Sequence, residues 1–166
     1  APSRADDSPY RLVRDFFYEA HNYIHELDTL GEELAGRLGD PQLRLTRLAT
    51  TLDRDLGVAV RFRRISNGPR RVYHPETREL HLRTGLSEAQ LCFELALQYA
   101  LTGHADLLRE LASSLPTEES RGIAVLALAQ YFAAAVVMPY EAMLSTAEEV
   151  RYDIDRLATH FGTGFE

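Results

Sequence analysis

The sequence predicts an α+β fold, mostly helical, with one small three-stranded antiparallel sheet. Apolar residues recur every three or four positions through most of the chain, as on helices, whereas in residues 57–84 they alternate with polar ones, as on strands. The chain has 166 residues, of which 45% are apolar, enough for one domain with its own core. We therefore predict a linker or cut end over residues 1–9 and a single domain over residues 10–166.

The first helix is predicted to begin at Val13. Its apolar positions follow alternating steps of three and four, which is the heptad rhythm of a seam between helices. Such a seam either joins two copies of the chain or packs the helix on its own domain, and three heptads leave both alternatives open. The seam positions are Val13, Phe16, Ala20, Tyr23, Leu27, Leu30 and Leu34.

A second helix is predicted over residues 41–55, started by Pro41. The segment "GVAVRFRRI" then predicts a strand with Val58, Val60 and Phe62 on one face. The turn "SNGP" leads to a second strand in "RRVYH", and "PETR" leads to a third in "ELHLRT". Together they predict an antiparallel meander with one buried face.

The second half of the chain is predicted to be helical. "SEAQ" at residues 87–90 has the form of a capping box and opens a helix. Further helices are predicted over 105–113, 118–138 and 139–150, and in "YDIDRLATHFG". The most apolar run, "GIAVLALAQYFAAAVVMP", has 18 residues with Gln130 and Tyr131 at its middle. Because a bilayer span takes roughly 20 apolar residues, we predict a buried core helix and no membrane contact.

Charge and cysteine content limit the classes of function. The net charge of −7 argues against this segment binding nucleic acid by itself, because that binding depends on neutralising phosphates. The single cysteine, Cys92, excludes an internal disulfide and an all-cysteine metal site. The low cysteine content fits a protein of the reducing cytoplasm.

The segment "LQYAL", residues 97–101, has the helical setting of the zinc-binding H-E-x-x-H motif of metallopeptidases. Leu97 and Leu101 stand where the two metal ligands would be, and Gln98 stands where the general base would be. Leu128 occupies the place of the third ligand, before Ala129. None of these side chains can ligate zinc or accept a proton from its water. We therefore predict no metal, no catalytic residues and no enzyme activity.

Two other patterns carry a functional and a structural alternative. His21 and His25 have the i,i+4 spacing that can place two imidazoles on one metal, but no further ligand is obvious, although Glu26 and Asp28 are near in sequence. Their structural alternative is a solvated helix face, which we favour. Five arginines form the one basic cluster and either bind phosphates or cover the solvated outer face of the sheet, the interpretation that we favour. They are Arg61, Arg63, Arg64, Arg70 and Arg71.

Several tyrosines lie on or beside apolar helix faces. A buried phenol needs a partner for its hydroxyl group. Several together favour a cavity in which a ligand supplies that partner, and ordinary core tyrosines explain the spacing equally well. The tyrosines are Tyr18, Tyr23, Tyr99 and Tyr131.

Three segments together resemble IrrE/ImmA-type domains, and more specifically the actinobacterial RamB/PrpR branch of short-chain fatty acyl-responsive transcriptional regulators. They are "VRDFFYEAHNYIHELDTLGEELA", "CFELALQYAL" and "LAQYFAAAVVMPYEAML…EVRYDIDRLATHFGTGFE". The resemblance implies an IrrE N-terminal-like, degenerate zincin-type domain that senses a ligand. It also implies an upstream helix-turn-helix that binds DNA and a C-terminal cysteine-bearing region that holds an iron–sulfur cluster, both outside this chain.

The resemblance further implies coenzyme A or a short-chain acyl-CoA as effector, control of acetate, propionate and glyoxylate-cycle genes, and a homodimer. By this resemblance, Tyr18 and Tyr99 are expected to contact the ligand, and Tyr99 lies inside the vestigial motif. Ala20 departs from members that carry an arginine there, which puts the affinity for a phosphorylated ligand in doubt. The expected ligand-binding set is Tyr18, Tyr99 and Tyr131, with Arg47, Arg151 and Arg156 as phosphate partners.

Overall fold

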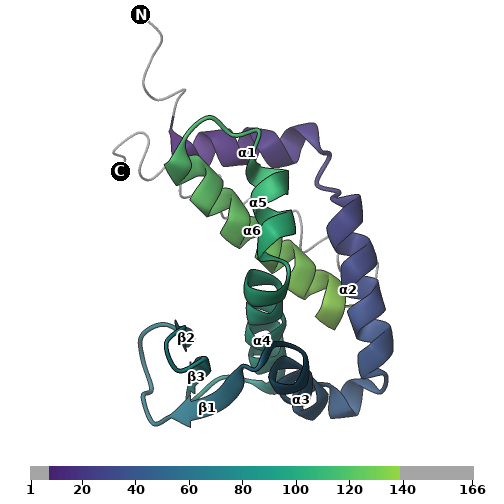
Figure 1. The fold of residues 1–166 in the computed structure, drawn as a ribbon, viewed down its shortest axis with the longest axis vertical. Helices are drawn as coiled ribbons and strands as arrows, with labels where there is room; N and C mark the ends of the chain where they lie inside the picture. Colours follow the sequence, from purple (N-terminus) through teal and green to yellow (C-terminus); the bar gives the residue numbers. More distant parts are fainter. Residues whose placement is uncertain (1–7, 139–166) are drawn as a thin grey trace, which may run out of the picture.

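The computed structural model describes residues 8–138. Within them, three α-helices precede one short sheet and three follow it (Figure 1). The predicted helix over 139–150 and the one in "YDIDRLATHFG" lie outside the described residues. The elements in chain order are α1 (Pro9–Glu19), α2 (His25–Leu38), a 3-10 turn η2 (Pro41–Leu43), α3 (Arg44–Leu56), β1 (Ala59–Arg63), β2 (Arg71–His74), β3 (Glu79–Arg83), α4 (Glu88–Gly103), α5 (Ala105–Ala112) and α6 (Glu118–Val137).

Helix α6 is the centre of the helical core. It packs against α4, α2, α1 and α5, and α4 in turn packs against α3. Thr117 and Ser120 form a capping box at its start. The helix is long and apolar enough to cross a membrane, but 61% of its most apolar window is buried inside the protein. The prediction of a buried core helix is therefore confirmed.

The sheet is mixed, so the prediction of an antiparallel meander is wrong. The strand order is β1-β3-β2: β3 pairs in parallel with β1 and antiparallel with β2. The two fully buried leucines of β3, Leu80 and Leu82, explain its central place, since an inner strand is covered best. Phe62 belongs to the edge strand β1 and is 61% exposed, against the expected burial.

The predicted first helix is two helices. His21 and Asn22 both have positive φ angles, 55° and 57°, and Asn22 N–H donates to the carbonyl of Phe17 at 2.9 Å, which ends α1. Val13 on α1 and Leu27 on α2 are fully buried in the core of this chain. The heptad positions therefore pack the two helices on their own domain, and the dimer-seam alternative is not supported.

The remaining predicted elements are close to their expected positions. The second helix begins at Arg44, after the 3-10 turn, and buries Leu48 and Leu52. Ser87 and Gln90 form both hydrogen bonds of the predicted capping box at the start of α4. Helix α4 thus runs from the sheet to α6, which places the "LQYAL" segment in the middle of the molecule (Figure 1).

Candidate functional site

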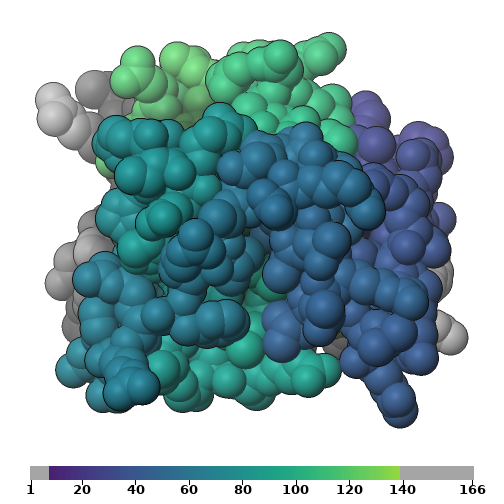
Figure 2. Space-filling model, turned by 60° about the horizontal axis from the view of Figure 1, so that its bottom comes forward, coloured from purple at the N-terminus to yellow at the C-terminus, as the bar shows by residue number. Residues whose placement is uncertain are grey.

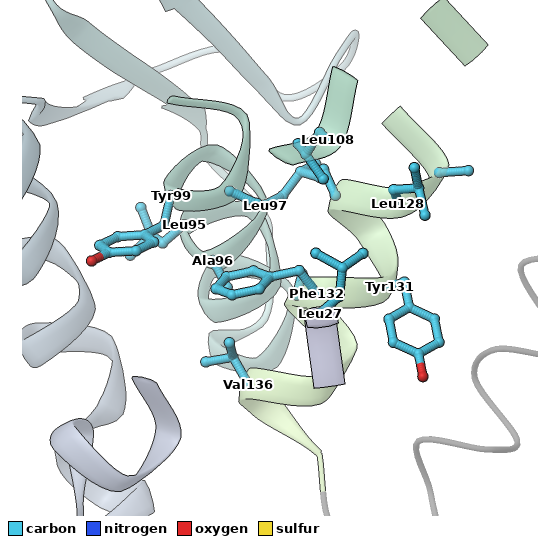
Figure 3. Close-up of a cluster of buried hydrophobic side chains, with 14 of the residues drawn as sticks. Leu27, Leu95, Ala96, Leu97, Tyr99, Leu108, Leu128, Tyr131, Phe132 and Val136 are labelled. Carbon is cyan, nitrogen blue, oxygen red and sulfur yellow. The ribbon is translucent and has the colours of Figure 1, made fainter. Parts of the chain in front are cut away.

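The leucines at the positions of the metal ligands are core residues. Leu97 on α4 and Leu128 on α6 are buried, and Leu101 is partly buried against the same core. Figure 3 shows Leu97 and Leu128 in one cluster with Leu108 of α5 and Phe132 of α6. Apolar packing therefore fills the place that a metal and its water take in a peptidase.

Gln98, at the position of the general base, is held by two hydrogen bonds. Its side-chain oxygen accepts from Arg71 Nη1 at 2.7 Å, and its side-chain nitrogen donates to Thr102 Oγ1 at 2.7 Å. Arg71 comes from β2, so this bond ties the edge of the sheet to α4.

The same guanidinium faces a buried carboxylate one turn earlier on α4. Arg71 Nε lies 3.6 Å from Glu94 Oε1, and Arg70 Nη1 lies 3.8 Å from Glu94 Oε2. Burial raises the pKa of Glu94, and both arginines oppose that rise. Burial likewise lowers the pKa of Arg71, against the attraction of Glu94. The vestigial peptidase helix thus carries an arginine–glutamate–glutamine cluster on its sheet-facing side.

The histidine pair does not form a metal site. His21 lies in the turn after α1, whereas His25 begins α2, so the two are not on one helix face. Among residues 8–138, no three His, Cys, Asp or Glu side chains are grouped to hold a metal ion. Cys92 is buried, and desolvation raises the pKa of its thiol, which disfavours the reactive thiolate.

Tyr99 is the centre of a second polar cluster, on a different face of α4 from the sheet-facing one. Its ring stacks on Phe132 with centroids 6.2 Å apart and planes 6° apart. Its hydroxyl donates to Asp55 Oδ2 at 2.9 Å, and Arg37 Nη2 donates to the same oxygen at 2.8 Å. The hydrogen bond from Arg37 lowers the pKa of Asp55, whereas burial raises that of Tyr99. One carboxylate therefore links α2, α3 and α4.

His104 completes the surroundings of Tyr99. Its ring lies 5.8 Å from that of Tyr99 and 5.3 Å from that of Phe132. Burial lowers the pKa of His104, and the charge of Glu33 on α2 opposes this. The neutral imidazole is thus the form that the packing favours.

The other expected ligand-binding residues are dispersed. Tyr18 on α1 is 66% exposed, and Arg47 on α3 donates to the carbonyl of Leu38 at 2.7 Å. The buried Tyr131 accepts a hydrogen bond from the backbone N–H of Ile24 at 3.2 Å. Figure 3 shows Tyr131 and Tyr99 with their hydroxyl groups directed to opposite sides. Arg151 and Arg156 lie outside the described residues.

Sequence analysis did not predict the part that four polar residues take in these clusters: Arg37, Asp55, Arg71 and Glu94. Arg71 was expected on the solvated face of the sheet, but it points to α4. Glu94 and Gln98 lie one helical turn apart in an otherwise apolar helix, and this was the available signal. Nothing in the sequence brings Arg37 and Asp55 together, because they are 18 residues apart on different helices.

A helical frame with a peptidase helix that has lost its metal ligands defines a degenerate member of a metallopeptidase-like class. The chain belongs to the IrrE N-terminal-like domain family, whose sequence profile matches residues 53–166. The family predicted from the sequence is thereby confirmed.

Its relatives are transcriptional regulators. It is 40% identical to the HTH-type transcriptional regulator PrpR and 36% identical to RamB, both of Mycobacterium tuberculosis, over 95% of this chain and 33% and 34% of theirs. A propionyl-CoA carboxylase regulator of Cereibacter sphaeroides is 34% identical over 96% of this chain and 34% of its own. The chain therefore spans about a third of the length of these relatives.

A solved structure of a Mycobacterium tuberculosis transcriptional regulator has the same fold. The TM-score is 0.75 at 35% identity, over 95% of this chain and 48% of that one.

Proposed function

We propose that this chain is the effector-binding and homodimerising domain of a cytoplasmic bacterial transcriptional regulator, without enzyme activity. Its effector is CoA or a short-chain acyl-CoA, and its targets are genes of acetate, propionate and glyoxylate metabolism. The observation that carries the proposal is the combination found on α4: leucines fill the positions of the metal ligands, while the neighbouring Tyr99 holds a charged cluster. Sequence-specific DNA binding belongs to a part of the regulator outside this chain.

The Tyr99 cluster has chemistry suited to such an effector. Arg37 is half exposed beside the Tyr99 hydroxyl, and a guanidinium matches phosphate oxygens better than any other side chain. The aromatic surface of Tyr99 and Phe132 offers an apolar face next to this charge. The printed name of one relative, a propionyl-CoA carboxylase regulator, indicates control of acyl-CoA metabolism in that protein.

The mechanism follows from what Asp55 connects. A ligand phosphate that takes Arg37 away from Asp55, or a ligand group that takes the Tyr99 hydroxyl, removes one of the two bonds between α2, α3 and α4. Such a ligand would favour a different packing of these helices, which is a shift between two populated states. A change in helix packing would reach a DNA-binding part through the dimer.

The first test is a thermal-unfolding series of this chain with CoA, acetyl-CoA, propionyl-CoA and butyryl-CoA, with zinc and EDTA as controls. Ligand at about a hundred times its dissociation constant stabilises the folded state by about 2.7 kcal/mol, which raises the melting temperature measurably. A rise with a CoA species supports the effector proposal. No rise with any of them leaves a ligand-free dimerisation module, and a rise with zinc alone supports a metallopeptidase.

Tyr99→Phe tests the proposed site more sharply than Tyr99→Ala, which would open a cavity beneath the stacked Phe132. The phenylalanine keeps the ring and removes only the hydroxyl group that bonds Asp55. We expect the CoA-dependent rise in melting temperature to be reduced. Tyr73→Phe, a partly buried tyrosine of β2, is the matched control and should retain the full rise. An unchanged rise in Tyr99→Phe would place the effector elsewhere.

Homodimerisation is tested separately by light scattering during gel filtration. A mass of two chains supports the dimer, and a monomer at all concentrations contradicts it. Substitution of a seam position such as Leu27→Glu cannot test the dimer, because Leu27 is fully buried in the core of one chain and a buried charge there would unfold that chain.

A further inference from the structure

Positive charge is concentrated in one part of this acidic protein. Residues 57–84, which contain the sheet, hold seven arginines and two glutamates, a net charge of +5. Since the whole chain has a net charge of −7, the rest carries −12. The sheet lies at one end of the molecule in Figure 1, and Figure 2 shows that end turned toward the viewer. The protein therefore has a basic end and an acidic helical body.

The arginines at the basic end differ in how they are engaged. Arg71 is committed to Glu94 and Gln98, as described above. The guanidinium groups of Arg63 and Arg64 form no hydrogen bond or ion pair with the described part of the chain. Arg61 and Arg70 are about half exposed, each with one carboxylate contact longer than 3.5 Å. We refer to Arg61, Arg63, Arg64 and Arg70 as the basic loop.

The backbone that carries the basic loop is fixed to the end of β3. Thr84 donates from its N–H to the carbonyl of Arg63 at 3.1 Å and from its hydroxyl to the carbonyl of Ile65 at 3.2 Å. Arg83 Nε donates to the carbonyl of Gly68 at 3.1 Å. These bonds fix the backbone of residues 63–68 to the end of β3, so a partner that binds the arginines need not order this segment.

Few carboxylates compensate this surface. Glu79 already faces Arg61 and His81, and Glu94 is buried behind Arg70 and Arg71. Glu76 is at the other end of the sheet, in the turn between β2 and β3. The guanidinium groups of Arg61, Arg63, Arg64 and Arg70 are therefore all exposed and little compensated by carboxylates.

We propose that the basic loop contacts the phosphate backbone of duplex DNA. Charge complementarity supports this partner, because a duplex carries one negative charge about every 1.7 Å and guanidinium groups bind phosphate oxygens in pairs. Repulsion of the acidic helical body weakens the contact, and it also orients the protein with its basic end toward the duplex. The contact is independent of any effector and would place a second, sequence-independent DNA contact in a domain proposed above to sense a ligand.

The test is binding of this chain to a fluorescent DNA duplex, followed by anisotropy between about 50 and 200 mM salt. Four phosphate contacts predict an affinity that falls about a hundredfold over that range, from a slope of about −0.9 per contact. Arg63→Glu/Arg64→Glu should bind weakly at low salt. Because it has about two fewer phosphate contacts, its affinity should fall only about tenfold over the same salt range.

Arg54→Glu/Arg109→Glu is the matched control, because it makes the same change in net charge at two well-exposed arginines of the helices. It should retain the wild-type salt dependence. Absence of DNA binding at low salt, or equal losses in the two double variants, would overturn the proposal. A loss of self-association in Arg63→Glu/Arg64→Glu without a change in DNA binding would assign the basic loop to the acidic helices of a second copy instead.

Discussion

At the residue scale, the close approach of α2 to α6 depends on Gly31. A Cβ atom added to Gly31 on α2 would lie 2.5 Å from the Cβ of Ala135 on α6, closer than real atoms come. The alanine-rich face of α6 allows this approach. Arg37, the member of the Tyr99 cluster on α2, belongs to the helix that is packed in this way. The sequence contains the glycine, but only the packing of α2 on α6 reveals why it is needed.

Gly31→Ala should therefore destabilise the protein by about 1–3 kcal/mol, the usual cost of overpacking a tight core. Gly36→Ala, on the same helix with no atom within 4 Å of the added Cβ, should instead stabilise it by about 0.5–1 kcal/mol through helix propensity. Urea unfolding of both variants measures the difference. A Gly31→Ala variant as stable as Gly36→Ala would contradict the described approach of the two helices.

At the scale of elements, the hydrophobic pattern predicts the helices well because burial and capping are local properties of the sequence. The capping box at Ser87 and the apolar run of α6 are two such signals, and both are confirmed. The pattern does not determine which elements pack against one another. It therefore misses the place of β3 between β1 and β2, the break at His21 and Asn22, and the inward turn of Arg71.

The Arg71 cluster is the main polar link between the sheet and α4. Arg71→Met should destabilise the protein by about 3 kcal/mol, because it leaves Glu94 buried beside only the more distant Arg70. Arg71→Met/Glu94→Gln should be less destabilised than the sum of the single variants. A double-mutant cycle by urea unfolding measures this coupling, and additive losses would show that Arg71 and Glu94 do not interact.

At the scale of the whole molecule, two faces of α4 have different chemistry. One face receives Arg71 from the sheet, whereas another packs Tyr99 together with Phe132 against the neutral His104. The sequence shows the arginine cluster and the lone His104 equally plainly. Only the fold shows that Arg71 is used inside the protein and that His104 is packed beside Tyr99.

This arrangement predicts the pH dependence of global stability. Burial lowers the folded-state pKa of His104 below 6.5, so the unfolded chain binds a proton first as the pH falls. Stability from His104 is therefore present above about pH 6.5 and is lost as the pH falls toward the lower folded-state pKa. The raised pKa of Glu94 acts in the opposite direction, since its folded state takes up the proton first and gains stability as the pH falls.

Urea unfolding at several pH values from about 7.5 to about 5 separates these contributions. As the pH falls, wild type loses the stability from His104 and gains stability from Glu94. His104→Gln should be less stable than wild type at neutral pH, but it does not undergo the His104 loss. Its stability relative to wild type should therefore rise as the medium is acidified. Glu94→Gln should show the reverse, a steeper loss of stability than wild type. If the stability of His104→Gln has the same pH dependence as that of wild type, burial does not lower the pKa of His104.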